Sequence, residues 1–295
     1  MQVATEGFFF AKLSDRRARR IGMRAAVFLP VVLTSVLTSI AYGQASNPNP
    51  VELMRKSAVT LKANEEKMRQ YAYRERQLTR VVDKNGKETN RHSETWDVIG
   101  LEGSAYRRLV MKDDKPLPPK EEKREEERLR KETEKRKKET PEQRRNGPFS
   151  FSYAFSFPHE KAAEIYDLRY TGEETMAGRR VWVIEGLPKP GFRPTNDQEK
   201  EALNYRLKVW LDQQDMVFSR VELEIITNHS RLQKGSAIRG DDVKSQDGVW
   251  LPSEVRIDFQ FRFFKLPGPR GDSVITFTDY HKFQVDSRVL EPAAQ

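Results

Sequence analysis

The side chains that could do chemistry are few and scattered along the chain. Zinc sites draw on ligands at short spacings such as His-Glu-x-x-His, and no such spacing occurs here. His281 follows Asp279 and Tyr280 and could act as a base, but a histidine on a strand surface is the commoner meaning of this pattern. The four histidines therefore predict neither a metal centre nor a catalytic base; they are His92, His159, His229 and His281.

Other reactive groups give no stronger prediction. Asp241, Asp242 and Asp247 resemble a loose calcium loop, but the EF-hand spacing is missing, and Gly240 and Gly248 favour an ordinary turn. The chain has no cysteine, which excludes disulfides, thiolate metal ligands and a cysteine nucleophile. Nucleophile-elbow, Walker A and dinucleotide-binding motifs are also missing from the sequence. We therefore expect no enzymatic activity, no cofactor and no metal.

The charge balance is mildly basic. The 295 residues include 53 Lys and Arg against 44 Asp and Glu, a formal net charge of +9. Residues 1–45 contribute +4 of this, which leaves +5 for the rest of the chain. So small an excess does not predict a nucleic-acid partner.

The N-terminus has the pattern of an export signal. Five arginines between Arg16 and Arg24 precede an apolar run over residues 25–40, and small residues follow up to Ala45. This order is typical of a secretory signal peptide, so we expect residues 1–45 to be one, cleaved near Gly43 or Ala45. The alternative is an uncleaved membrane anchor, for which the apolar run has about the minimum length.

Two stretches alternate so regularly that they predict the fold. Apolar residues occupy the odd positions of residues 205–211 and 255–263, and mostly polar residues lie between them. Such strands bury one face and expose the other, which is typical of an antiparallel sheet covered on one side. A helix is predicted over residues 51–70. Strands are predicted over residues 71–82, 95–101, 106–111, 149–157, 165–171, 179–187, 203–212, 217–227, 232–239, 249–264 and 273–285.

Short connections between these strands predict a meander, and a sheet of this size curls. We expect a mainly β (α+β) fold, in which a half-open antiparallel β-barrel of about ten or eleven strands wraps the N-terminal helix. Residues 46–111 supply that helix and the first strands, and residues 149–295 supply the remainder of the barrel domain. Arg270, Gly271 and Asp272 form an integrin-type tripeptide, which we expect in a hairpin turn.

Residues 112–148 interrupt the sheet pattern. From Lys120 to Arg145 the chain is almost wholly Lys, Arg and Glu, and several acid–base pairs are spaced i,i+4 with the acid first. We expect a charged insertion, compatible with a helix, that is solvated and has no face to bury. The alternative is a docking arm through which this segment binds an envelope protein partner.

Three segments carry a family resemblance. They are Arg179-Arg180-Val181-Trp182-Val183-Ile184, Trp210-Leu211-Asp212 turning back into Ser219-Arg220-Val221, and Gly248-Val249-Trp250-Leu251-Pro252. With the export signal they make residues 51–290, apart from the insertion, resemble the outer-membrane lipoprotein-sorting protein family (the LolA/LolB/RseB-like superfamily). The resemblance implies an unclosed barrel, plugged by helices, whose hollow receives an acyl chain or a lipidated protein. It also implies that the protein is located in the periplasm of a Gram-negative-type bacterium.

Aromatic residues are the best candidates to line such a hollow. Ordinary barrel core is the alternative, because alternating aromatic residues pack equally well under a helix. Two functions stay open: a non-enzymatic carrier of an acyl chain or lipidated partner, and an interaction or sensor module for a protein partner without transported lipid. The candidate ligand-binding residues are Phe149, Phe151, Phe155, Phe157, Trp182, Phe259 and Phe261.

Overall fold

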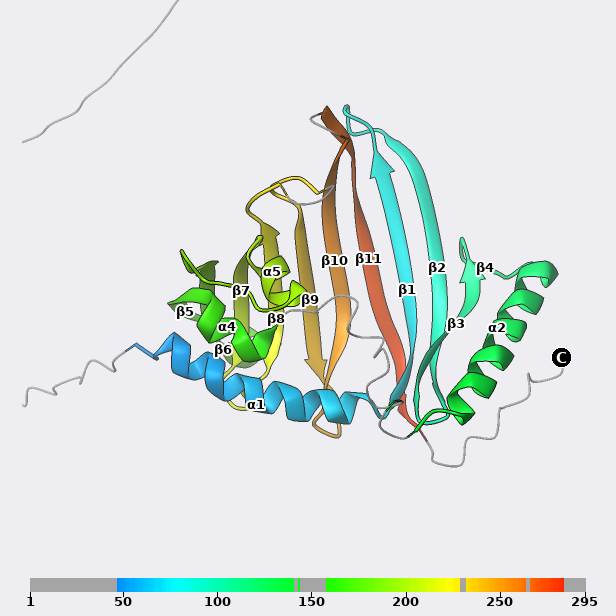
Figure 1. Cartoon of the computed structure of the whole chain (residues 1–295), viewed down its shortest axis with the longest axis horizontal. Helices are drawn as coiled ribbons and strands as arrows, with labels where there is room; N and C mark the ends of the chain where they lie inside the picture. The colour runs from blue at the N-terminus through cyan, green and yellow to red at the C-terminus, as the bar shows by residue number, and fades with distance from the viewer. Residues whose placement is uncertain (1–46, 141–142, 144–157, 229–231, 264–265, 284–295) are drawn as a thin grey trace, which may run out of the picture. The chain divides into compact units, whose positions relative to one another are not determined.

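An eleven-stranded antiparallel sheet makes up most of the described chain (Figure 1). The computed structural model describes residues 47–140, 143, 158–228, 232–263 and 266–283, all within the unit Ser46–Gln295. The helices are α1 (Pro50–Met68), α2 (Pro119–Lys137), η2 (His159–Lys161), α4 (Ala162–Ile165) and α5 (Asp197–Ala202). The strands are β1 (Tyr71–Val82), β2 (Glu88–Leu101), β3 (Ser104–Lys112), β4 (Lys115–Pro116), β5 (Tyr166–Met176), β6 (Arg179–Pro188), β7 (Tyr205–Asp212), β8 (Phe218–Ile225), β9 (Ala237–Lys244), β10 (Trp250–Phe263) and β11 (Leu266–Lys282).

The strand order is β4-β3-β2-β1-β11-β10-β9-β8-β7-β6-β5. Two meanders, β1 to β4 and β5 to β11, are joined where the first strand pairs with the last. The end strands β4 and β5 do not pair with each other, so the sheet is not closed. The expected mainly β fold, a half-open antiparallel barrel of ten or eleven strands with helices, is confirmed.

Helix α1 is capped at its N-terminus and is bonded to the sheet near its C-terminus. The side chain of Asn49 caps its first turn, and Pro50 supplies the fixed φ that suits this position. Near the other end, Asn64 Nδ2 donates to the carbonyl oxygen of Trp250 (2.8 Å), and Asn64 Oδ1 accepts from the Trp250 N–H (2.9 Å). Figure 1 shows α1 running across the strands, close to the ends of the strands on one side of the sheet. Its buried residues are Leu53, Met54, Ser57, Asn64 and Met68.

Alternation along the strands gives the sheet two different faces. The face covered by α1, here called the inner face, carries the main apolar cluster, which includes Leu207 and Val209 of β7. The outer face carries ion pairs such as Arg220–Asp241, with 2.5 Å between Nε and Oδ1. No described helix is long and apolar enough to cross a membrane.

Two local predictions about turns are wrong. Arg270, Gly271 and Asp272 lie inside β11 and not in a hairpin turn, because the β10–β11 connection comes earlier in the chain. Asp241 and Asp242 lie in β9, and the turn follows them at residues 245–248.

The charged insertion does form a helix, α2, but the expectation that it buries no face is also wrong. Glu125 and Arg136 of α2 are buried against the sheet through polar contacts, which a search for apolar faces does not detect.

Candidate functional site

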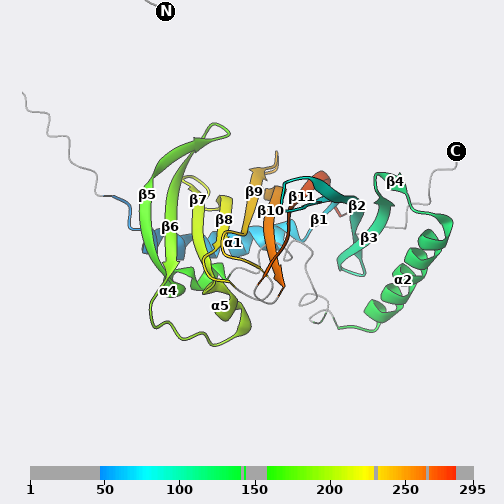
Figure 2. The same ribbon diagram turned by 90° about the horizontal axis from the view of Figure 1, so that it is seen from above.

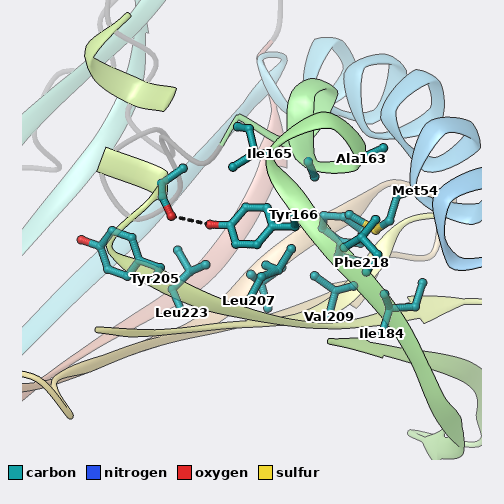
Figure 3. Close-up of a cluster of buried hydrophobic side chains, with 14 of the residues drawn as sticks. Met54, Ala163, Ile165, Tyr166, Ile184, Tyr205, Leu207, Val209, Phe218 and Leu223 are labelled. Carbon is teal, nitrogen blue, oxygen red and sulfur yellow. Dashed lines mark hydrogen bonds between the residues drawn. The ribbon is translucent and has the colours of Figure 1, made fainter. Parts of the chain in front are cut away.

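The space between α1 and the sheet is filled by the protein's own side chains. Met54 of α1 and Ala163 of α4 pack with Tyr166 above Leu207 and Val209 of β7 (Figure 3). The Tyr166 hydroxyl donates to the carbonyl oxygen of Ala202 (2.6 Å), and burial raises the Tyr166 pKa above its usual value. This part of the inner face is therefore packed core.

The apolar inner face continues beyond this core across β9, β10 and β11. Ile238 of β9 lies opposite Ile257 of β10, and Val255 of β10 lies opposite Ile275 of β11. Val255 is buried, whereas Ile238, Ile257 and Ile275 are only half-buried. We call these four residues the inner-face strip. Half-buried aliphatic side chains on three neighbouring strands form a surface on which an apolar ligand could lie.

The structure brings two of the predicted ligand-binding residues together. The rings of Phe259 and Phe261 are 4.9 Å apart on β10, and Phe259 continues the alternation of the inner-face strip. Trp182 lies on β6, four strands away, where it packs half-buried against the main core. The remaining four, Phe149, Phe151, Phe155 and Phe157, lie outside the described residues.

Phe259 packs against Gly271 of the neighbouring strand. A Cβ at Gly271 would lie 2.8 Å from Phe259 Cζ and 1.9 Å from the Arg80 carbonyl oxygen, so only glycine fits between β1 and β10 at this point. A pocket of about 270 Å³ opens beside this contact. Four of its seven lining residues have charged or amide side chains, so it is not the apolar hollow that the aromatic residues predict. Its lining residues are Val82, Asp258, Phe259, Gln260, Arg270, Gly271 and Asp272.

On β1 to β3 the inner face carries the apolar residues Tyr73 and Val98 and, beside them, a buried charged pair that sequence reasoning missed. The Glu75 side chain is 6% exposed, and Arg107 Nη2 lies 2.5 Å from its Oε1. The Arg107 guanidinium also stacks 4.2 Å above the ring of Trp96. Burial raises the pKa of Glu75, while Arg107 acts in the opposite direction. The available signal was Glu75 itself, a carboxylate at an inward position of an alternating strand.

The segments that carry the family resemblance meet in one polar cluster. Asp212, at the end of β7, accepts from Arg179 Nε (2.6 Å) and from the backbone N–H of Asp215 (2.7 Å). The Asp215 carboxylate in turn accepts from Arg179 Nη2 (2.8 Å) and from the indole N–H of Trp250 (3.0 Å). This cluster ties β6, β7 and β10 together through Arg179, Asp212, Asp215 and Trp250. The motifs therefore hold the sheet together, and they place no reactive group in a cleft.

Groups that could hold a metal do not converge in the described residues, where no three His, Asp or Glu side chains cluster. His92 and His281 are exposed, and His229 lies outside the described residues. The carboxylate of Asp241 is shared by Arg220 and Arg239, and that of Asp247 accepts from Ser245 Oγ (2.6 Å).

Comparison with solved structures finds similar chains. An outer membrane lipoprotein-sorting protein domain from Vibrio parahaemolyticus matches with a TM-score of 0.40 and 14% identity, covering 81% of this chain and 95% of that one. A LolA superfamily protein from Nitrosomonas europaea matches with a TM-score of 0.31 and 10% identity, covering 78% and 94%. MucB in the MucA/MucB complex of Pseudomonas aeruginosa gives a TM-score of 0.24 and 13% identity, covering 75% and 92%.

The first two descriptions name the family that the sequence motifs resemble. No protein-family model matches the chain. No curated protein matches it either.

Proposed function

We propose that this chain is a non-enzymatic protein of the cell envelope that binds an acyl chain or a lipidated partner on its inner face. The observation that supports the proposal is the inner-face strip, which continues the apolar surface beyond the packed core and leaves three of its four residues half-buried. Each CH₂ group that a ligand buries there would contribute about 0.8 kcal/mol. Phe259 and Phe261 extend the strip along β10 and would contact the same ligand.

Export to the periplasm belongs to the same proposal. The basic, apolar and small-residue order of residues 1–45 supports cleavage of a signal peptide. Analysis of the N-terminal residue of the protein recovered from the periplasm tests this part, with a new N-terminus expected near Ser46.

Displacement of a fluorescent fatty acid from the purified protein tests ligand binding. Replacing Ile275 with aspartate is expected to weaken probe binding by about tenfold or more, because a carboxylate must lose hydration when an acyl chain covers it. The matched control is Val274→Asp. Val274 is the preceding residue, is also half-buried and lies on the outer face opposite Arg256, so this variant is expected to bind as the parent does. Equal losses in the two variants would show that the inner face is not the binding surface.

A second function is supported by the packed core beneath α1. Since the protein's own side chains fill that space, the chain is also suited to be an interaction or sensor module that recognises a protein partner without transporting lipid. The charged segment Lys120–Arg145 would then carry recognition. A parent protein that binds no fluorescent fatty acid at all would favour this function over the first.

A further inference from the structure

Strand β3 lies next to one edge of the sheet, and its partner on the side away from β2 is the short strand β4. It pairs with β2 on one side, but on the other side β4 reaches only Met111 and Lys112. Among the described residues, no strand pairs with the backbone groups of residues 104–110 that point away from β2. An edge of this kind is a template for pairing with the strand of another chain.

Helix α2 lies along this edge (Figures 1 and 2). Glu125 Oε1 accepts from the backbone N–H of Leu109 (3.3 Å), and Arg128 Nη2 donates to the carbonyl oxygen of Arg107 (2.7 Å). These are one donor and one acceptor of the kind that a neighbouring antiparallel strand would bond. Two turns further on, Arg136 Nη1 donates to the carbonyl oxygen of Ser104 (3.1 Å).

The contact is well buried although it is made of charged groups. Glu125 is 8% exposed and Arg136 is 7% exposed. The hydroxyl of Tyr106 donates to Glu125 Oε1 (3.0 Å), and the guanidinium groups of Arg128 and Arg136 lie over the Tyr106 ring. Burial, followed by the bond to Glu125, raises the pKa of Tyr106 to about 12. The helix is thus held by charge-assisted bonds to β3, which are the stronger class of hydrogen bond.

The edge strand on the opposite side of the sheet, β5, is protected from pairing by different features. β5 has a bulge between Tyr170 and Gly172, and it exposes the charged residues Asp167 and Arg169. Bulges and charges are both known ways to keep an edge strand from pairing with other molecules. Both edges of the sheet are therefore protected from pairing with an edge strand of another copy of this chain.

We propose that α2 is an edge cover. Glu125, Arg128 and Arg136 take the place of a further strand and prevent β3 from pairing with an edge strand of a second copy of this chain. The charged side chains of α2 that face away from the sheet are in contact with solvent, and those that face the sheet form hydrogen bonds with the backbone of β3. The role of this segment is then to prevent association, in contrast to that of a docking arm.

The test compares two triple variants of the purified protein. The first, Glu125→Ala/Arg128→Ala/Arg136→Ala, removes the side chains that bond β3. The second, Lys123→Ala/Glu126→Ala/Arg130→Ala, removes one acid and two bases from exposed positions of the same helix. Hydrogen exchange reports on the amide of Leu109, and light scattering after size-exclusion chromatography reports molar mass over a series of protein concentrations.

The first variant is expected to exchange the Leu109 amide about tenfold faster and to gain molar mass as concentration rises. The control variant is expected to match the parent in both measurements. Faster exchange without any gain in molar mass would overturn the proposal, as would unchanged exchange. If the triple variant fails to fold, Arg128→Ala alone removes the bonds to the Arg107 carbonyl and to Glu125 and the stacking on Tyr106, and it leaves the hydrogen bond between Tyr106 and Glu125 in place, so the same two readouts decide the question.

Discussion

Replacing Asp212 with alanine is expected to lower the free energy of unfolding by about 3–5 kcal/mol. The Asp212 side chain is fully buried and accepts hydrogen bonds from Arg179 Nε (2.6 Å) and Arg179 Nη2 (2.7 Å). It also accepts from the backbone N–H of Gln214 (3.0 Å) and of Asp215 (2.7 Å) in the β7–β8 turn. Alanine would leave Arg179 Nε and the two backbone N–H groups without this acceptor, which costs more than the lost contacts alone, while Arg179 Nη2 keeps its bond to Asp215. Because Arg179 is 26% exposed and can regain some hydration, the lower end of the range is expected.

Asp97→Ala is the matched control for this prediction. Asp97 also accepts two bonds from one arginine, Arg74 (2.8 and 3.2 Å), but both side chains are substantially exposed. Loss of an exposed pair is expected to cost about 0–1 kcal/mol. Denaturant unfolding of the two variants and the parent measures the difference. Similar costs for Asp212→Ala and Asp97→Ala would mean that the Asp212 cluster does not hold the sheet together.

The strands were predictable because alternation is a local property of the sequence. Residues 71–82 were predicted as a strand and form β1. β7 and β10 contain the two stretches, residues 205–211 and 255–263, whose apolar odd positions predicted them. β9 begins at Ala237, five residues later than predicted, since the turn after β8 extends through Gly235 and Ser236. The pairing of β1 with β11 depends on contacts between distant parts of the chain, so no local pattern could predict it.

The candidate site was less predictable for a different physical reason. Hydrophobic patterns find residues that avoid water, and they led to Phe259, Phe261 and Trp182. They do not find carboxylates and guanidinium groups that are buried because they bond one another or the backbone. Glu75 with Arg107 and Glu125 with the edge of β3 are of this kind, and only the fold shows which charges meet. In α2 the buried face is marked by charged residues at helical spacing and not by an apolar stripe.

The second large effect is expected at Asp242, where replacement by asparagine should stabilise the protein at neutral pH. Burial, followed by the nearby charge of Asp241, raises the pKa of Asp242 to about 7. In the described chain no arginine, lysine or hydrogen-bond donor reaches its carboxylate, whereas Asp241 is shared by Arg220 and Arg239. The folded protein therefore holds a proton on Asp242 that the unfolded chain releases near pH 4. Between about pH 4 and pH 7, this group makes the folded state less stable as pH rises.

Asp242→Asn removes this titration, so its stability relative to the parent should grow through that window and level off above about pH 7. The expected gain at neutral pH is about 2–3 kcal/mol, less than the full shift implies, because the half-buried carboxylate keeps some contact with water. Asp241→Asn is the matched control, and it should destabilise the protein because Arg220 and Arg239 lose their shared partner. Chemical unfolding at a series of pH values measures both. A gain for Asp242→Asn that does not change between about pH 4 and pH 8 would show that Asp242 ionises in the folded protein as it does in water.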